Sequence, residues 1–400
     1  MKTYLLATAI LGALATGCFW ASLNAPATEL LARIGVDPWV GSQVLAGVFG
    51  VALILALVPS AREYVRKWWN ASAPTVLDEK THHPNFDGLR LVLALSVLFF
   101  HIHNRTSPIY SGLFAAVPCF LAISGFVVLQ SFGRSQSWLH FARKRFLRVM
   151  PAFIISLFFS GLLLGAPAIF RTIQIWGTFG FAASDNRPVG DGVVWSLSCE
   201  EVFYAALAVI YLAGGYRRPA IIWFLLFTSI VFAWQVLPGH SVLWSNVLSL
   251  GPAFWIGNLV YLYRDRLACL PKWIPCVALI LTSFAFFVRG DDIQVQFIQQ
   301  CAFVASLIWC AAFGPVLLPI LKNDLSYGVY IYHLPILTVL LAHHLAHWLF
   351  ISTGLLLTLS MATLSWFGIE RYALQLKNWR PSRISTVPTS IASSQLPPTG

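Results

Sequence analysis

Residues 86–104 read FDGLRLVLALSVLFFHIHN, and this nearly apolar stretch carries titratable groups at both ends. As an α-helix it places Arg90 and His101 about three turns apart, roughly 16 Å along the axis and within about 20° of one face. Asp87 falls about 40° from His101 by the same arithmetic. Ionisable groups on an apolar helix are costly, so this stripe is expected to face a polar cavity inside the protein. The plain alternative is a helix with an ordinary cytoplasmic cap and a histidine at the far membrane surface.

The composition is that of a membrane protein. Of 400 residues, 58% are hydrophobic and 10% are charged, whereas soluble domains carry about 25% charged residues. About twelve windows are apolar over a length that crosses a bilayer. We therefore predict an all-α fold: a polytopic transmembrane helical bundle of about 10 core helices plus an N-terminal helical hairpin. The windows lie near residues 3–23, 42–59, 88–106, 113–131, 149–168, 195–214, 219–236, 245–263, 272–288, 295–318, 325–344 and 347–367.

The chain divides into four parts. Residues 1–60 form the predicted hairpin, and residues 61–84 a basic, aromatic and polar cytoplasmic linker. Residues 85–378 form the main transmembrane domain, and residues 379–400, rich in Ser, Thr and Pro, a disordered cytoplasmic tail. The first residues also have the basic and apolar regions of a signal peptide ending at Cys18. A retained helix is preferred, because its removal would leave the basic linker without a hairpin partner.

Positive charge is distributed unevenly along these windows. With the amino terminus inside, 21 of the 26 lysines and arginines fall in cytoplasmic segments. This bias follows the positive-inside rule and predicts a multi-pass protein of the plasma (bacterial inner) membrane with both termini cytoplasmic. The net charge of +11 thus follows from topology and does not indicate nucleic acid. The seven cysteines show no metal-ligand or disulfide spacing, so no metal is expected.

A basic cluster precedes the window at 149–168. Such clusters are commonly topology signals or sites for anionic lipid headgroups. Arg145 and Arg148, however, are one helical turn apart, and guanidinium groups at that spacing can hold phosphate oxygens through paired hydrogen bonds. The sequence leaves both interpretations open. The cluster consists of Arg143, Lys144, Arg145 and Arg148.

Two adjacent carboxylates, Glu200 and Glu201, lie just inside the window that begins at Trp195. Ser196, Glu200 and Tyr204 recur at i, i+4 and i+8 and therefore share one helix face. Carboxylates at this depth cost several kcal/mol unless they are paired, hydrated or protonated. This pattern favours a functional site.

A third polar stripe lies in LSYGVYIYHLPIL, residues 325–337. Ser326, Tyr330 and His333 share a face at i, i+4 and i+7. Pro335 predicts a kink in this helix. A histidine within an apolar window implies an internal partner.

Six stretches, taken in order, resemble the motifs of the membrane acyltransferase 3 family, whose members O-acylate carbohydrates outside the cytoplasm. They are FDGLR to His101, FLAISGF, RKRFLRVMP, VVWSLSCEEVFY, LSYGVYIYHLP and FGIER. The similarity covers roughly residues 85–375. Tyr372 stands where the family usually has proline, Cys199 where it often has valine, and Val202 where it often has glutamine.

The resemblance implies a reaction across the membrane. Members take an acyl group, often acetyl, from acyl-coenzyme A (acyl-CoA) on the cytoplasmic side and deliver it to a sugar hydroxyl on the far side. The basic cluster would hold the phosphates of coenzyme A, with Arg90 adding to that cradle or orienting Asp87. Membrane lipids and a carbohydrate acceptor are the implied partners, and no nucleic acid is expected. The cofactor-binding residues would be Arg90, Arg143, Lys144, Arg145 and Arg148.

The same resemblance makes His101 either the general base on the acceptor hydroxyl or a covalent carrier of the acyl group. Glu200 or Glu201 would orient His101 or grip the sugar. The directions of the two helices further predict that Glu200 and Glu201 lie near His101 in one cavity, with Glu200 facing it, because all three lie in the outer half of the membrane. Asp87 completes the catalytic set. The predicted substrate-binding residues are Trp195, Ser196, Tyr204, Tyr330 and His333.

The alternative function is a secondary transporter or flippase, because buried charges also occur in proteins that move ions or lipids. No internal repeat supports it. Consumption of acyl-CoA by the purified protein would separate the two classes.

Overall fold

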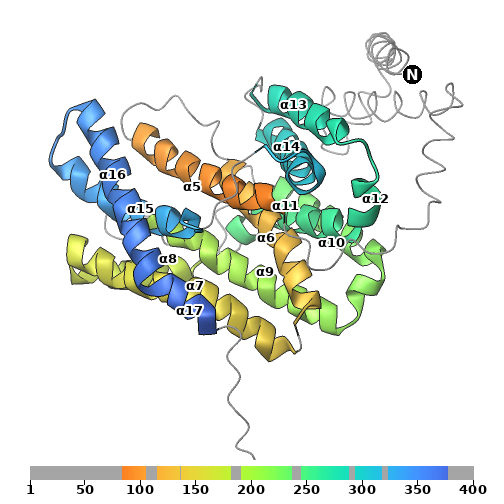
Figure 1. Cartoon of the computed structure of the whole chain (residues 1–400), viewed down its shortest axis with the longest axis horizontal. Helices are drawn as coiled ribbons and strands as arrows, with labels where there is room; N and C mark the ends of the chain where they lie inside the picture. The colour runs from red at the N-terminus through yellow and green to blue at the C-terminus, as the bar shows by residue number, and fades with distance from the viewer. Residues whose placement is uncertain are drawn as a thin grey trace, which may run out of the picture.

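The computed structural model describes residues 83–104, 115–135, 137–181, 191–236, 245–287, 293–317 and 323–376. Within these ranges every regular element is a helix and none is a strand, which confirms the all-α prediction (Figure 1). The predicted hairpin, the linker up to residue 82 and the tail from residue 377 lie outside the described residues.

Six segments in the described part of the chain are long and apolar enough to cross a membrane, judged by length and composition. Three shorter apolar helices accompany them, so the predicted number of about ten core helices stays a prediction. The long segments contain α5 (Pro84–Asn104), α6 (Ala116–Gly133), α7 (Trp138–Leu164), α9 (Trp195–Leu212), α14 (Ile293–Phe313) and α16 (His347–Ser365), which continues into α17 (Arg371–Gln375). The shorter helices are α10 (Pro219–Val236), α13 (Trp273–Phe287) and α15 (Ser326–Ala342); α8 (Ala166–Gly177), α11 (Ser245–Leu262) and α12 (Arg264–Ala268) complete the set.

Helix α7 begins earlier than the sequence windows predict. Ser137 caps its N-terminus by accepting a hydrogen bond from the backbone N–H of His140. The basic cluster therefore lies inside the helix, in its first three turns, and Pro151 does not end it. Helix α8 ends at Gly177 and is followed by a turn in which Gly180 has φ 84°.

Helices α6 and α11 pack closely enough for backbone to touch backbone. A Cβ on Gly125 of α6 would collide with the carbonyl oxygen of Phe254, and one on Gly257 of α11 would collide with that of Ala122. Small residues allow this approach between apolar helices.

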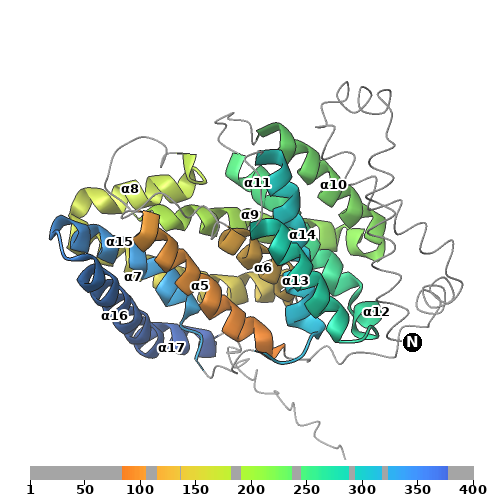
Figure 2. The same ribbon diagram turned by 90° about the horizontal axis from the view of Figure 1, so that it is seen from above.

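Helix α15 is the central element for the site. It packs against α5, α7 and α16, and its middle is almost entirely buried. Figure 2 shows α5 running beside α15, with α13 and α14 on the other side of α5. Helix α5, which carries the first motif, and α15, which carries the fifth, therefore lie side by side.

Candidate functional site

A cavity of about 110 Å³ lies among α5, α6, α7, α9 and α15. Arg90 enters it from α5, and Arg145 and Arg148 enter it from α7. Residues three apart on a helix share a face, which explains why both α7 arginines reach it. We call this space the arginine cavity. Its other polar lining residues are Ser124, Ser196, Glu200, Tyr204, Ser326, Tyr327 and Tyr330.

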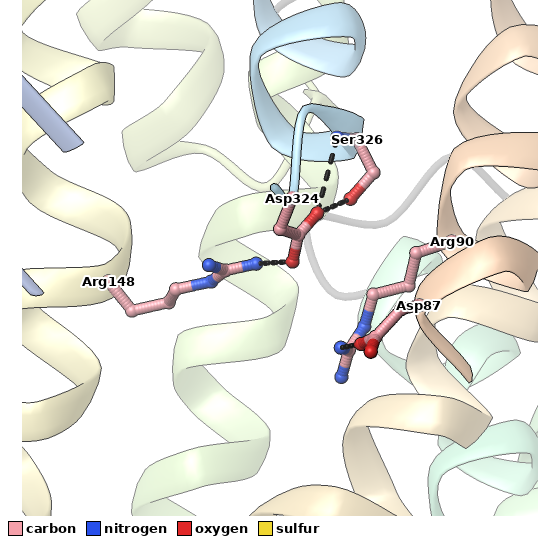
Figure 3. Close-up of polar contacts among 5 residues, drawn as sticks. All are labelled: Asp87, Arg90, Arg148, Asp324 and Ser326. Carbon is pink, nitrogen blue, oxygen red and sulfur yellow. Dashed lines mark hydrogen bonds and ion pairs between the residues drawn. The ribbon is translucent and has the colours of Figure 1, made fainter. Parts of the chain in front are cut away.

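Asp324, just before α15, is the counter-ion of Arg148 (Figure 3). Its carboxylate accepts hydrogen bonds from Arg148 and from the hydroxyl and backbone N–H of Ser326. Arg90 pairs with Asp87 at 3.6 Å. Burial raises the pKa of Asp324, but the charges of Arg148 and Arg90 and the Ser326 hydrogen bond outweigh burial and hold that pKa below its usual range. Asp324 is therefore ionised at neutral pH and fixes Arg148 beside the cavity.

The other two members of the basic cluster point elsewhere. A guanidinium N–H of Arg143 donates to the carbonyl oxygen of Leu376 at 2.7 Å. The ammonium group of Lys144 donates to the Ser135 hydroxyl at 3.4 Å. Neither residue lines the arginine cavity. Their contact with phosphates stays a prediction.

Glu200 is held by hydroxyl groups from two helices. The Ser124 and Tyr204 hydroxyls both donate to its Oε1, and the two hydroxyl oxygens are 3.1 Å apart. The guanidinium carbon of Arg145 lies 5.7 Å from the centre of the Tyr204 ring. Ser196, Glu200 and Tyr204 all line one cavity, in agreement with the predicted polar stripe.

A second cavity, of about 100 Å³, contains His101 of α5 and Trp195 of α9. We call it the histidine cavity. Val117 and Tyr330 line both cavities, so these side chains form a shared wall. The Tyr330 hydroxyl is anchored in that wall, 2.7 Å from the Ser196 hydroxyl oxygen.

His101 and His333 are in contact: Nδ1 of His101 and Nε2 of His333 are 3.1 Å apart. Nδ1 of His101 also lies 2.9 Å from the Val97 carbonyl oxygen, and Nδ1 of His333 lies 2.7 Å from that of Tyr330. A carbonyl oxygen only accepts, so each Nδ1 carries a hydrogen. Nε2 of His333 then accepts from Nδ1 of His101. In the neutral ring, Nε2 of His101 is the nitrogen left with a basic lone pair.

A family model described as an acyltransferase domain matches residues 83–370. The chain belongs to this acyltransferase family. The resemblance drawn from the six motifs is thereby confirmed.

Two relatives of this acyltransferase cover most of its length. It is 28% identical over 354 residues to Nodulation protein 10 of Rhizobium leguminosarum bv. viciae. This alignment covers 74% of this chain and 94% of that protein. It is 27% identical over 320 residues to the O-acetyl transferase of Shigella phage Sf6. This alignment covers 72% of this chain and 94% of that protein. No solved structure matches the chain.

The predicted meeting of Glu200 and His101 is wrong. The acyltransferase places Glu200 in the arginine cavity and His101 in the histidine cavity. The face of α9 that carries Glu200 meets Ser124 of α6, whose hydroxyl satisfies the carboxylate. Packing of α15 on α5 supplies His333 as the partner of His101.

Three further predicted site residues lie outside both cavities. His333 is fully buried, lines neither cavity and contacts His101, and its contact with a substrate stays a prediction. Asp87 lines neither cavity, and its ion pair with Arg90 fits the alternative that the two residues orient each other. Glu201 lies outside both cavities, in a groove between α7 and α9.

Asp324 is the residue that sequence reasoning missed. A signal was present, because Asp324 is the sole acidic residue between Asp292 and Glu370. A single carboxylate in so apolar a stretch calls for a cationic partner. The acyltransferase supplies Arg148 for that purpose.

Proposed function

We propose that this acyltransferase moves an acyl group, in the simplest case acetyl, from cytoplasmic acyl-CoA to a carbohydrate hydroxyl across the bacterial inner membrane. The observation that carries the proposal is the shared wall of Val117 and Tyr330 between an arginine-lined cavity and a cavity containing His101. A donor in one cavity and an acceptor in the other would then meet where the two cavities adjoin, beside Val117 and Tyr330. The phage relative named as an O-acetyl transferase supports transfer to oxygen.

The arginines suit the donor. Coenzyme A carries phosphates, which guanidinium groups bind through paired, charge-assisted hydrogen bonds. A cavity of about 110 Å³ admits only the narrow, acyl-bearing arm of the donor. The phosphates would therefore stay outside the narrow part of the cavity, beside Arg145 and Arg148 in the first turns of α7.

His101 suits the transfer step. Nε2 of His101 takes the proton of the acceptor hydroxyl as that oxygen attacks the thioester carbonyl carbon. The carbon–sulfur bond then breaks, and His101 returns the proton to the departing thiolate. His333 holds the imidazole in the required tautomer through Nδ1. The same nitrogen of His101 would serve a two-step route through an acyl-histidine.

Full-length protein purified into phosphatidylcholine vesicles tests the proposal. Acetyl-CoA is supplied on the side that exposes the basic cluster, and an oligosaccharide mixture on the other side. We expect thiol release that depends on the acceptor, together with acetylated sugar detected by mass spectrometry. A burst of thiol release before steady turnover would select the acyl-histidine route. Movement of lipid or ions with no thioester cleavage would instead establish the transporter or flippase alternative.

The acceptor itself is best identified in cells. Mass spectrometry of surface glycans with and without the gene should reveal one acyl group that is lost with the gene. Unchanged glycans, together with acyl-CoA turnover in vesicles, would show that the acceptor is not a surface carbohydrate.

A further inference from the structure

A groove of about 580 Å³ lies between α7 and α9, outside the two cavities. Helix α8 packs against both helices, and its Trp176 closes one end of the groove. Apolar residues at helical spacing form the walls, among them Phe141 and Phe146 of α7 and Ala205 and Val209 of α9. We call this space the α7–α9 groove.

Three polar atoms in this apolar groove lack a hydrogen-bond partner although they are buried. They are Nε of Arg145, Nε1 of Trp176 and Oε1 of Glu201. Buried polar atoms in proteins are nearly always paired, and an unpaired one points to a missing partner. Two of these atoms donate and one accepts.

The groove opens toward the bilayer. On membrane-spanning helices, apolar side chains that are exposed in the isolated chain face lipid. Phe146, Val209 and Leu212 line the groove and are 59%, 66% and 66% exposed. From Glu201 to Leu212 the groove follows α9 for about 16 Å, long enough for an aliphatic chain to lie along it.

We propose that the α7–α9 groove binds a neutral, hydroxyl-bearing membrane lipid that enters from the bilayer. Its aliphatic chain lies along α7 and α9, and its hydroxyl groups pair with Arg145, Trp176 and Glu201. A hydroxyl suits this set because it both donates to a carboxylate and accepts from N–H groups. The groove carries one cation, Arg145, and one carboxylate, Glu201, so the two charges together favour a head group without net charge. Acyl transfer is not required for this binding.

A photoreactive monoacylglycerol with a diazirine in its chain tests the proposal. Full-length protein in phosphatidylcholine vesicles is irradiated with the probe, digested, and mapped by mass spectrometry. We expect labels on the groove faces of α7 and α9. Ala205→Trp fills the groove and should remove most of this labelling. Leu162→Trp is the matched control, because Leu162 is on α7, is 82% exposed and lies outside the groove.

Trp176→Phe keeps the aromatic ring and removes one donor. It should lower labelling by about three- to tenfold, the ratio that corresponds to one hydrogen bond. This smaller change keeps the proposal testable if Ala205→Trp does not accumulate.

Three results would overturn the proposal: labels spread evenly over all lipid-facing helices, labelling unaffected by both groove variants, or stronger labelling by a phosphatidic acid probe than by the monoacylglycerol. Each of these readouts is independent of thiol release, so failure here and failure of the proposed acyl transfer are distinguishable.

Discussion

At the residue scale, the two histidines have different surroundings and therefore different expected effects. His101 lines a cavity, whereas His333 is fully buried behind it and reaches it through Nε2. His101→Ala should lower acyl transfer by about 10²- to 10⁴-fold, the usual value of a positioned base, while the protein still accumulates in the membrane. Acceptor-dependent thiol release measures the loss.

Variants of His333 distinguish a role in positioning His101 from a direct role in the reaction. His333→Gln retains an acceptor for the Nδ1 hydrogen of His101 and should keep much more activity than His333→Ala. Activity within a few-fold of wild type in His101→Ala would show that His101 is an ordinary interfacial histidine. Equal loss in both His333 variants would show that the hydrogen bond does not position His101.

Asp324 predicts a pH-dependent stability. Because its folded-state pKa is lowered, its stabilising contribution is present above the unfolded pKa of about 4 and is lost as the pH falls toward the folded value. Asp324→Asn leaves Arg148 without its anionic partner and should cost ~3 kcal/mol at pH 7. The difference in Tm between wild type and variant should shrink below about pH 5.

Asp265→Asn is the matched control for that measurement, because Asp265 forms a looser pair with the adjacent Arg264 at 3.8 Å. Its Tm should stay close to that of wild type. A difference between wild type and Asp324→Asn that is unchanged from pH 7 down to pH 2 would contradict an electrostatic origin.

At the element scale, the continuous helix α7 sorts the basic cluster by face. Arg145 and Arg148 line the arginine cavity, whereas Arg143 donates to the carbonyl of Leu376. Arg145→Ala and Arg148→Ala should raise the KM for acyl-CoA by about tenfold or more, since charge-assisted hydrogen bonds contribute roughly 1.5–3 kcal/mol. Lysine at either position should restore binding only in part, because a point charge does not reproduce a planar fork.

Arg143→Ala is the comparison for those variants. We expect a much smaller change in KM, because its guanidinium group is directed away from the cavity. Full rescue by lysine at both Arg145 and Arg148 would mean that charge alone suffices.

The α6–α11 contact gives a second prediction at this scale. Gly257→Ala forces a methyl group against the Ala122 backbone and should destabilise the protein by about 2 kcal/mol or more. Gly177→Ala at the end of α8 is the control, since a Cβ there meets nothing within 4 Å. Thermal unfolding of both variants in detergent compares them. Equal Tm values would show that the two helices separate readily.

The sequence could predict which side chains share one face of a helix, because that follows from helical periodicity alone. The shared face of Ser196, Glu200 and Tyr204 followed from spacing alone and is present in the structure. Partners across helices did not follow, because packing selects them: Glu200 meets Ser124, and His101 meets His333. His333 is one of the predicted site residues, but nothing in the spacing joins α6 to α9 or α5 to α15.

At the scale of the whole molecule, two cavities with one shared wall suggest a test of the route between them. Val117 lines both cavities. Val117→Trp should plug the contact between them and lower transfer to the acceptor at least about tenfold, the effect of small misplacements at reacting centres. Binding of acyl-CoA, measured by isothermal titration, should change little.

Val92→Trp on α5 is the matched control, because Val92 is 50% exposed and lines neither cavity. Transfer by this variant should equal that of wild type. Normal transfer by Val117→Trp would place the reaction path elsewhere in the bundle.

The shared wall also has a consequence for the cell's energy balance. Among the residues that the structure describes, Val117 and the anchored Tyr330 are the only ones that line both cavities. A contact narrowed by these two side chains would let an acyl group change sides while water and ions are kept from forming a continuous file across the bilayer. By the proposed reaction, the enzyme would modify a carbohydrate outside the cytoplasm without dissipating the electrochemical gradient across its own membrane.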